Sequence, residues 1–228
     1  TNLSKVINNI FDGIYKFYIN NIVLVTYDEP TTGNIIASDC YCITIVYWSS
    51  YNTIAQGCKQ IYFDSGCSNN EIGPYSSKIN FGSQCINNSL GANNEKIEFG
   101  EGCDANIIDS TAYNITFDTQ CDSNIINSYA QNVTFASSCY SNTIGTNTKN
   151  IELGSLSYKN TIGSGVGELD GVTFGDGCVN NNVGNGTDDL IFGSNCASNI
   201  IGENTDGCKL CANSCWNEIG SGCSDIWL

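Results

Sequence analysis

Two aspartates provide the arrangement in this sequence that comes nearest to an active site. Asp104 and Asp122 are separated by 18 residues, the period with which most of the chain repeats. If each period forms one coil of a stacked structure, both carboxyl groups lie on one outward face, about 5 Å apart, near the separation found in retaining glycosidases. An acidic repeat protein also stacks some carboxylates without any catalytic role, and we favour that structural interpretation.

Four cysteines near the C-terminal end form a second candidate site. The run Cys208-x-x-Cys211-x3-Cys215, followed by Cys223, resembles the spacing of metal ligands. Cys208, however, occupies a repeat position that is aliphatic in every other unit. The chain contains no histidine, which further lowers the expectation of a metal site and excludes Ser-His-Asp and Cys-His catalysis. No phosphate-binding glycine loop or basic patch occurs either. We therefore assign no catalytic, cofactor-binding or metal-binding residue and expect no cofactor.

These residues all belong to an 18-residue repeat. We number each unit from its first aliphatic position, called position 0. Position 2 is usually Phe, position 9 is Asn in every unit, position 11 is always Ile, Leu or Val, and position 6 is Cys or a small hydroxyl residue. The unit from Ile151 runs for 21 residues, and all the others run for 18. The units begin at Val25, Ile43, Ile61, Ile79, Ile97, Ile115, Val133, Ile151, Val172, Leu190 and Cys208.

The repeat predicts short parallel strands. Apolar residues alternate with polar ones and are followed by Gly or Asp, as in strands broken by turns, whereas a helical or leucine-rich repeat requires a different spacing. We predict an all-β, single-stranded parallel β-solenoid (β-helix) of about 11 coils, with a right-handed coil favoured. Positions 0, 2, 6, 9 and 11 are expected to point inward or line bends, and small residues at position 15 to fill a corner. The asparagines are expected to form a hydrogen-bonded stack, and the glycines at positions 3 and 12 to adopt positive φ.

The two ends and one insertion depart from the repeat. Residues 1–24 are predicted to be an N-terminal cap, built of strands with a turn at Asp12-Gly13 or of an amphipathic helix; residues 25–228 form the solenoid domain. The three extra residues between Gly163 and Val172 are expected to bulge from a corner. Residues 226–228 begin a twelfth coil with unpaired strand edges. We therefore expect the native chain to continue past Leu228 or another chain to cap it, most simply in a homotrimer.

Composition and charge limit the kinds of partner that we expect for this chain. The net charge of −15 repels nucleic acid and anionic membranes, and the chain has no apolar run long enough for a spanning helix. We therefore expect neither a nucleic-acid partner nor membrane insertion.

The cysteines at position 6 would stack beyond the usual disulfide range. We interpret the whole column as buried thiols behaving as small hydrophobic residues: Cys67, Cys85, Cys103, Cys121, Cys139, Cys178 and Cys196. The first five are predicted to be reduced and inert to labelling until the protein unfolds.

Two further surface patterns have weak functional meaning. A threonine column at outward position 1 resembles ice-binding faces, but other residue types interrupt it, so a regular flat array is not formed. The column contains Thr26, Thr44, Thr116, Thr134 and Thr173, and is interrupted by Tyr62, Glu98, Glu152, Lys209 and Trp227. Asn-x-Ser/Thr triplets, which resemble glycosylation acceptors, are expected by chance in a chain this rich in Asn, Ser and Thr. Examples begin at Asn87, Asn114, Asn132 and Asn185.

The repeat motif itself resembles a known class of repeats. Gly-x-x-Cys-x-x-Asn-x-Ile-Gly, from Gly193 to Gly202 and nearly so from Gly82 to Gly91, is similar to Asn- and Cys-rich solenoid repeats in proteins of gut Bacteroidetes and their phages, including crAss-like phages. The resemblance covers residues 25–228 and carries over no catalytic residue. It implies an elongated phage fibre or adhesin-like part.

The leading hypothesis is a structural or receptor-binding module of an elongated virion fibre or surface appendage, located on the virion or the extracellular surface. Its expected partners are further copies of the chain, other virion or surface proteins, and host glycan. The alternative is a polysaccharide-degrading enzyme of the tail-spike type. An acidic nucleic-acid mimic and an ice-binding protein are less favoured, because the acidic residues are scattered and the threonine column is broken.

Overall fold

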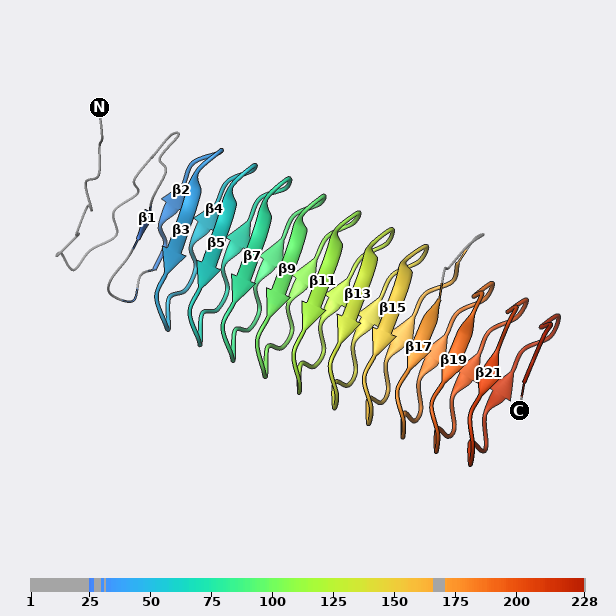
Figure 1. Ribbon diagram of the computed structural model, residues 1–228. Coiled ribbons are helices and arrows are strands. Elements are labelled where there is room, and N and C mark those ends of the chain that lie inside the picture. The colour runs from blue at the N-terminus through green and yellow to red at the C-terminus, as the bar shows by residue number, and fades with distance from the viewer. Residues whose placement is uncertain (1–24, 27–29, 31, 166–170, 228) are drawn as a thin grey trace.

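The computed structural model describes residues 25–26, 30, 32–165 and 171–227, and the side chains from residue 30 onward within these ranges. The chain is an all-β, parallel solenoid: each coil adds one strand to each of two 11-stranded sheets, which run along the same rod (Figure 1). The predicted fold class is confirmed. The predicted cap over residues 1–24, the insertion at 166–170 and Leu228 lie outside the described residues. The described ranges contain no helix, and so none there that could cross a membrane.

Every coil contributes one strand to each sheet: the strands of the second sheet have two residues, and those of the first have three to five except β1 and β21, which have two. The first sheet contains β1 (Val25–Thr26), β3 (Tyr41–Ile45), β5 (Lys59–Phe63), β7 (Ser77–Phe81), β9 (Glu95–Phe99), β11 (Tyr113–Phe117), β13 (Gln131–Phe135), β15 (Lys149–Leu153), β17 (Val172–Phe174), β19 (Leu190–Phe192) and β21 (Lys209–Leu210). The second contains β2 (Ile35–Ile36), β4 (Thr53–Ile54), β6 (Glu71–Ile72), β8 (Ser89–Leu90), β10 (Ile107–Ile108), β12 (Ile125–Ile126), β14 (Thr143–Ile144), β16 (Thr161–Ile162), β18 (Asn182–Val183), β20 (Ile200–Ile201) and β22 (Glu218–Ile219).

The strand register follows the sequence period. Ile61 pairs with Ile79, which in turn pairs with Ile97. Between β15 and β17 the register advances by 21 residues, so that Ile151 pairs with Val172 and the columns realign after the longer unit. Each repeat position therefore forms a continuous column along the rod.

The core consists of the predicted inward columns. The described side chains at positions 0, 2 and 11 are buried in nearly every coil, with Ile219 in the last coil only partly buried. The rings of Phe63, Phe81, Phe99, Phe117 and Phe135 stack with centroids 4.5–4.7 Å apart, and Phe174 stacks on Phe192 at 4.5 Å. Position 15 is filled by small or mid-sized side chains that are buried in every described coil except the last, where Cys223 is half-buried. The predicted core is confirmed.

The asparagines at position 9 form the predicted continuous stack, from Asn34 to Asn217. At Asn106, Nδ2 donates to Oδ1 of Asn124 at 3.1 Å and to the carbonyl oxygen of Cys85 at 3.0 Å. Its Oδ1 accepts from both the backbone N–H and Nδ2 of Asn88, at 2.9 and 3.0 Å. Every hydrogen-bonding site of the buried carboxamide is used, so the stack satisfies itself.

The glycines at positions 3 and 12 correct one prediction. Their φ angles are not positive; instead, a Cβ on Gly82 or Gly73 would lie 2.8 Å from the backbone nitrogen of Ser65 or 2.6 Å from that of Gln56. These glycines allow successive coils to approach closely. Positive φ occurs at positions 5, 8, 14 and 17 of the coil, in residues as different as Gly66, Asn69 and Trp48. The left-handed conformation thus recurs every nine residues, at 5 and 14 and at 8 and 17.

Candidate functional site

The two candidate aspartates lie in adjacent coils, as the period predicts, and each holds the backbone of the next coil. Oδ1 of Asp104 accepts the backbone N–H of Asp122 at 2.8 Å, and Oδ1 of Asp122 accepts that of Tyr140 at 2.8 Å. Both carboxylates are half-buried. Each side-chain oxygen satisfies a backbone N–H of the following coil, which favours the structural interpretation.

The electrostatics of this column depend on burial and on Asp122. Burial raises the pKa of Asp104; the N–H donated by Asp122 opposes this effect, and the charge of Asp122 adds to it. A hydrogen bond to Asp122, together with its charge, raises the pKa of Tyr140 to about 12. The ring of Tyr140 stacks on that of Tyr158 with centroids 4.8 Å apart. The column therefore places a carboxyl group with a raised pKa next to a second carboxylate and two aromatic rings.

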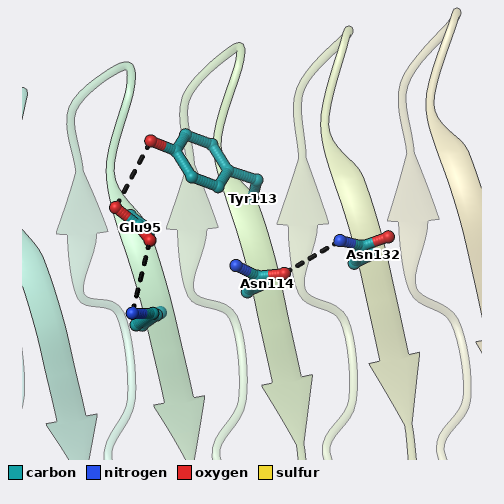
Figure 2. Close-up of polar contacts among 5 residues, drawn as sticks. Glu95, Tyr113, Asn114 and Asn132 are labelled. Carbon is teal, nitrogen blue, oxygen red and sulfur yellow. Dashed lines mark hydrogen bonds and ion pairs between the residues drawn. The ribbon is translucent and has the colours of Figure 1, made fainter.

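A second polar ladder runs on the outward face of the first sheet. Nδ2 of Asn132 donates to Oδ1 of Asn114 at 2.8 Å, and Nδ2 of Asn150 donates to Oδ1 of Asn132 at 2.9 Å. Beside it, the hydroxyl of Tyr113 donates to Glu95 at 3.3 Å (Figure 2). Two of the Asn-x-Ser/Thr triplets, those at Asn114 and Asn132, thus have their amides engaged in this ladder.

Of the position-1 threonines, Thr116 and Thr134 lie on the same strands as Asn114 and Asn132. Thr116 and Thr173 are exposed, and Thr44 and Thr134 are half-buried. Thr134 and Thr173 line a shallow groove with Asn132, Asn150 and Glu152. A similar groove on the second sheet is lined by Glu71, Ser89, Ile107, Asp109 and Asn127, among others. Both grooves follow the rod axis between outward columns. Their walls carry amide, hydroxyl and carboxylate groups that offer hydrogen bonds to an extended ligand.

The cysteine column at position 6 is buried, as predicted, but its thiols do more than fill space. The thiol of Cys103 donates to the carbonyl oxygen of Gly82 at 3.1 Å, and its sulfur accepts the backbone N–H of Cys85 at 3.3 Å. The same S–H···O bond recurs along the column. All the described cysteines are free thiols. The column therefore satisfies backbone groups at a bend, which a purely hydrophobic role does not explain.

The pKa values of the cysteine column are shifted by hydrogen bonds between the thiols and by burial. The hydrogen bond with the Cys103 thiol is the largest cause that raises the pKa of Cys121, to about 12, and burial adds to it. At the N-terminal end of the run, the hydrogen bond with the Cys85 thiol lowers the pKa of Cys67. Cys67 is itself 0% exposed, so access rather than acidity limits its reaction.

The C-terminal cysteines do not converge on one point. Cys208 is buried in the aliphatic column, where burial raises its pKa to about 11. Cys211 and Cys223 are half-buried and Cys215 is exposed. Within the described residues, no three His, Cys, Asp or Glu side chains are placed to hold a metal ion.

One surface feature was not identified from the sequence: an aromatic patch at a corner of the coil from Ile43. Tyr47, Trp48 and Tyr51, at positions 4, 5 and 8, are 46%, 66% and 64% exposed. In the other coils position 4 is never aromatic, and positions 5 and 8 are mostly Gly, Gln, Asn or Ser. The clustering of three aromatics at outward positions of one coil is the sequence signal that would have revealed it.

Comparisons with known proteins identify no relative: no family model, no curated protein and no solved structure matches this chain.

Proposed function

We propose that this chain is a stiff structural module of an elongated virion fibre or surface appendage, with receptor-binding groups on its outward columns. The observation that carries the proposal is the unbroken axial bonding, in which both sheets and the buried asparagine stack link coil to coil along the described rod. Eleven strands per sheet at about 4.8 Å per strand give a length of roughly 50 Å.

The division between inward and outward columns supports the same proposal. Inward positions keep their residue types from coil to coil, whereas outward position 1 changes from Thr to Tyr, Asn, Glu and Lys. A stack of this kind separates two ends by a fixed distance and leaves its surface free for recognition. The resemblance of the repeats to those of gut Bacteroidetes and their phages, and the acidic surface, support a place on a virion or cell exterior.

Lateral association in a homotrimer is part of the proposal. Ile107 and Ile125, adjacent on the outward side of β10 and β12, are 42% and 40% exposed. An apolar strip of this kind can be covered by a second rod packed alongside. Other virion or surface proteins are the expected partners at the ends of the assembly, and host glycan the expected receptor.

The proposal is tested by locating the protein. Antibodies raised against the purified 228-residue chain are applied with gold labels to particles and cells of the source culture, and sedimentation measures the mass of the purified chain. We expect gold along fibres or appendages and a trimer in solution. Gold confined to the cell interior would refute the fibre proposal, and a monomer at all concentrations would refute the trimer.

A second candidate, a polysaccharide-degrading enzyme, is favoured by one observation: the raised pKa of Asp104 beside the carboxylate of Asp122. Such a pair can serve as acid and nucleophile in glycoside hydrolysis. Incubation with capsular or host polysaccharides, followed by an assay for new reducing ends, tests it. Cleavage that Asp104→Asn or Asp122→Asn abolishes would establish the enzyme in place of the structural module.

A further inference from the structure

The aromatic patch of Tyr47, Trp48 and Tyr51 is presented rigidly. The backbone N–H of Trp48 donates to the carbonyl oxygen of Ser65 at 3.1 Å, and that of Tyr51 donates to Ser68 at 3.2 Å. The six-membered ring of Trp48 lies over buried Gly66, where a Cβ would come within 2.6 Å of its Cε3 atom. One face of the indole is therefore supported by backbone and the ring is largely exposed to solvent, so binding a ligand costs little side-chain entropy.

The patch also occurs where the backbone disfavours it. Trp48 and Tyr51 have φ angles of 58° and 56°, in the left-handed region that bulky residues seldom adopt. The corresponding residues of the next coil, Gly66 and Asn69, suit this conformation better. Every coil from Ile43 onward adopts this conformation at the same positions, in residues that include Leu156 and Lys159, so the backbone does not require aromatics there, and the exposure of three of them at one corner is the feature to be explained.

We infer that Tyr47, Trp48 and Tyr51 form a binding site for the pyranose rings of a neutral polysaccharide, an inference that rests on the proposed receptor-binding function. The apolar C–H face of a pyranose stacks on an aromatic ring, and its hydroxyls bond to polar groups at the edge. Ser65, Ser68 and Asn69 of the next coil are at least partly exposed and supply such groups.

The size of the patch favours a sugar over a protein partner. At the observed exposures, three aromatic side chains present roughly 300–400 Å² to solvent, given about 150–250 Å² for each such side chain. A stable protein–protein interface needs about 800 Å² from each partner. The patch is therefore too small to hold a second copy of the chain by itself.

The charge of the surroundings favours a neutral sugar. Residues 46–51 and 64–69, which form this corner in two successive coils, contain Asp64 and no Lys or Arg. An anionic polysaccharide would find no counter-charge here and would be repelled by the carboxylate of Asp64 and by the net charge of −15.

The chain offers substitutions that preserve the backbone. Trp48→Asn and Tyr51→Asn introduce the residue type that the same positions have at Asn195 and Asn69, both with positive φ. Trp216 provides a matched control, because it is 86% exposed, has a φ of 58° and lies at position 8 like Tyr51. Its coil has Ala212 and Asn213 where Tyr47 and Trp48 stand, so it is a lone aromatic.

The test is electrophoresis of the full 228-residue chain through native gels containing mannan, xylan or mixed-linkage β-glucan, with polygalacturonate as the anionic comparison. We expect at least one neutral polysaccharide to retard the wild-type chain. Trp48→Asn should weaken this binding at least 10-fold and Tyr51→Asn several-fold, whereas Trp216→Asn should bind as wild type. Melting temperatures of the variants should equal or exceed that of the wild type, which separates lost binding from lost folding.

Several results would overturn the inference: no retardation by any neutral polysaccharide, equal retardation of wild type and Trp48→Asn, or preference for polygalacturonate. So would a self-association that Trp48→Asn removes, seen by sedimentation, since the occupant would then be a second copy. If gold labels the fibres but the retardation by polysaccharide does not depend on Trp48, this inference is refuted and the proposed function is not. If a neutral polysaccharide retards the chain but the gold labels are confined to the cell interior, the proposed function is refuted and this inference is not.

Discussion

Ser157 is the described residue whose buried side chain has an unmet hydrogen-bonding group: its Oγ has no partner. It occupies position 6, between Cys139 and Cys178. Those two thiols donate to the carbonyl oxygens of Asp118 and Gly154 at 3.3 and 3.4 Å. The longer C–S bond carries the cysteine sulfur to a carbonyl that the shorter serine side chain does not contact here. We therefore predict that Ser157→Cys stabilises the fold.

The expected gain in the free energy of unfolding follows from the unpaired hydroxyl that Ser157→Cys removes and the hydrogen bonds that it adds. A buried polar group without a partner costs about 1–3 kcal/mol, and a new neutral hydrogen bond contributes about 0.5–1.5 kcal/mol. By analogy with the bond from Cys121 N–H to the Cys139 sulfur, at 3.4 Å, the new sulfur also accepts the backbone N–H of Cys139. We expect the free energy of unfolding to rise by about 1–2 kcal/mol and the melting temperature by about 3–6 °C, on the scale usual for domains of this length.

The assay is urea and thermal unfolding under reducing conditions, together with amide hydrogen exchange over residues 151–165. The exchange measurement matters because a solenoid can open one coil at a time. Cys103→Ser is the reverse control and should destabilise the fold, since a hydroxyl on the shorter side chain would contact the Gly82 carbonyl less closely than the thiol does at 3.1 Å. If Ser157→Cys is neutral or destabilising while Cys103→Ser is tolerated, the hydrogen-bonding role of the column is wrong.

Four further outcomes are expected. Phe99→Ala, in the middle of the ring stack, should lower the free energy of unfolding by roughly 3–5 kcal/mol in urea titrations; a loss below about 1 kcal/mol would contradict the stacked core. Asn106→Leu should cost several times more stability than Asn132→Leu in the same titration, because only the former leaves buried partners unpaired; equal losses would argue against that distinction. A maleimide should label Cys215 in the native protein and the cysteine column only after unfolding, as mass spectrometry can count; rapid native labelling of the column would show that it opens. Because burial raises the pKa of Asp104, the folded chain binds that proton more tightly than the unfolded chain, so the ionised form is destabilising. Asp104→Asn should therefore raise the melting temperature at neutral pH, with a gain that shrinks in acid; an opposite pH trend would refute the burial argument.

The architecture could be predicted from the sequence because each inward position tolerates only a few residue types. A column spaced by one coil must hold a side chain that packs or bonds with its own copy above and below, so Phe99 and Asn106 recur as Phe117 and Asn124. Such a constraint appears directly as a residue pattern. The register, the core and the asparagine stack all follow from it.

The left-handed positions were not predicted, because their residue types are only loosely constrained. Gly and Asn are common there, yet the same conformation holds Lys78, Leu156 and Trp48. The neighbouring coil fixes φ through backbone hydrogen bonds, such as that from Trp48 N–H to Ser65, and these bonds are invisible in a one-dimensional pattern. For the same reason the glycines at positions 3 and 12, which allow close approach between coils, were assigned the positive φ that belongs to other positions. The hydrogen bonds of the cysteine column also required coordinates, since a buried thiol is equally consistent with simple packing.

The two asparagine ladders show why function in this fold is to be sought on the outward columns. The buried ladder at Asn106 and the outward ladder at Asn132 make the same amide-to-amide bond, at 3.1 and 2.8 Å. Inside, water cannot replace a lost partner, so any substitution breaks the stack; outside, water replaces it at little cost. Outward residues are therefore free to change without loss of the fold, and three exposed aromatics gathered at one corner need another reason. Tyr47, Trp48 and Tyr51 meet that condition, whereas Asp104 and Asp122 already have a structural reason in the N–H groups that they accept.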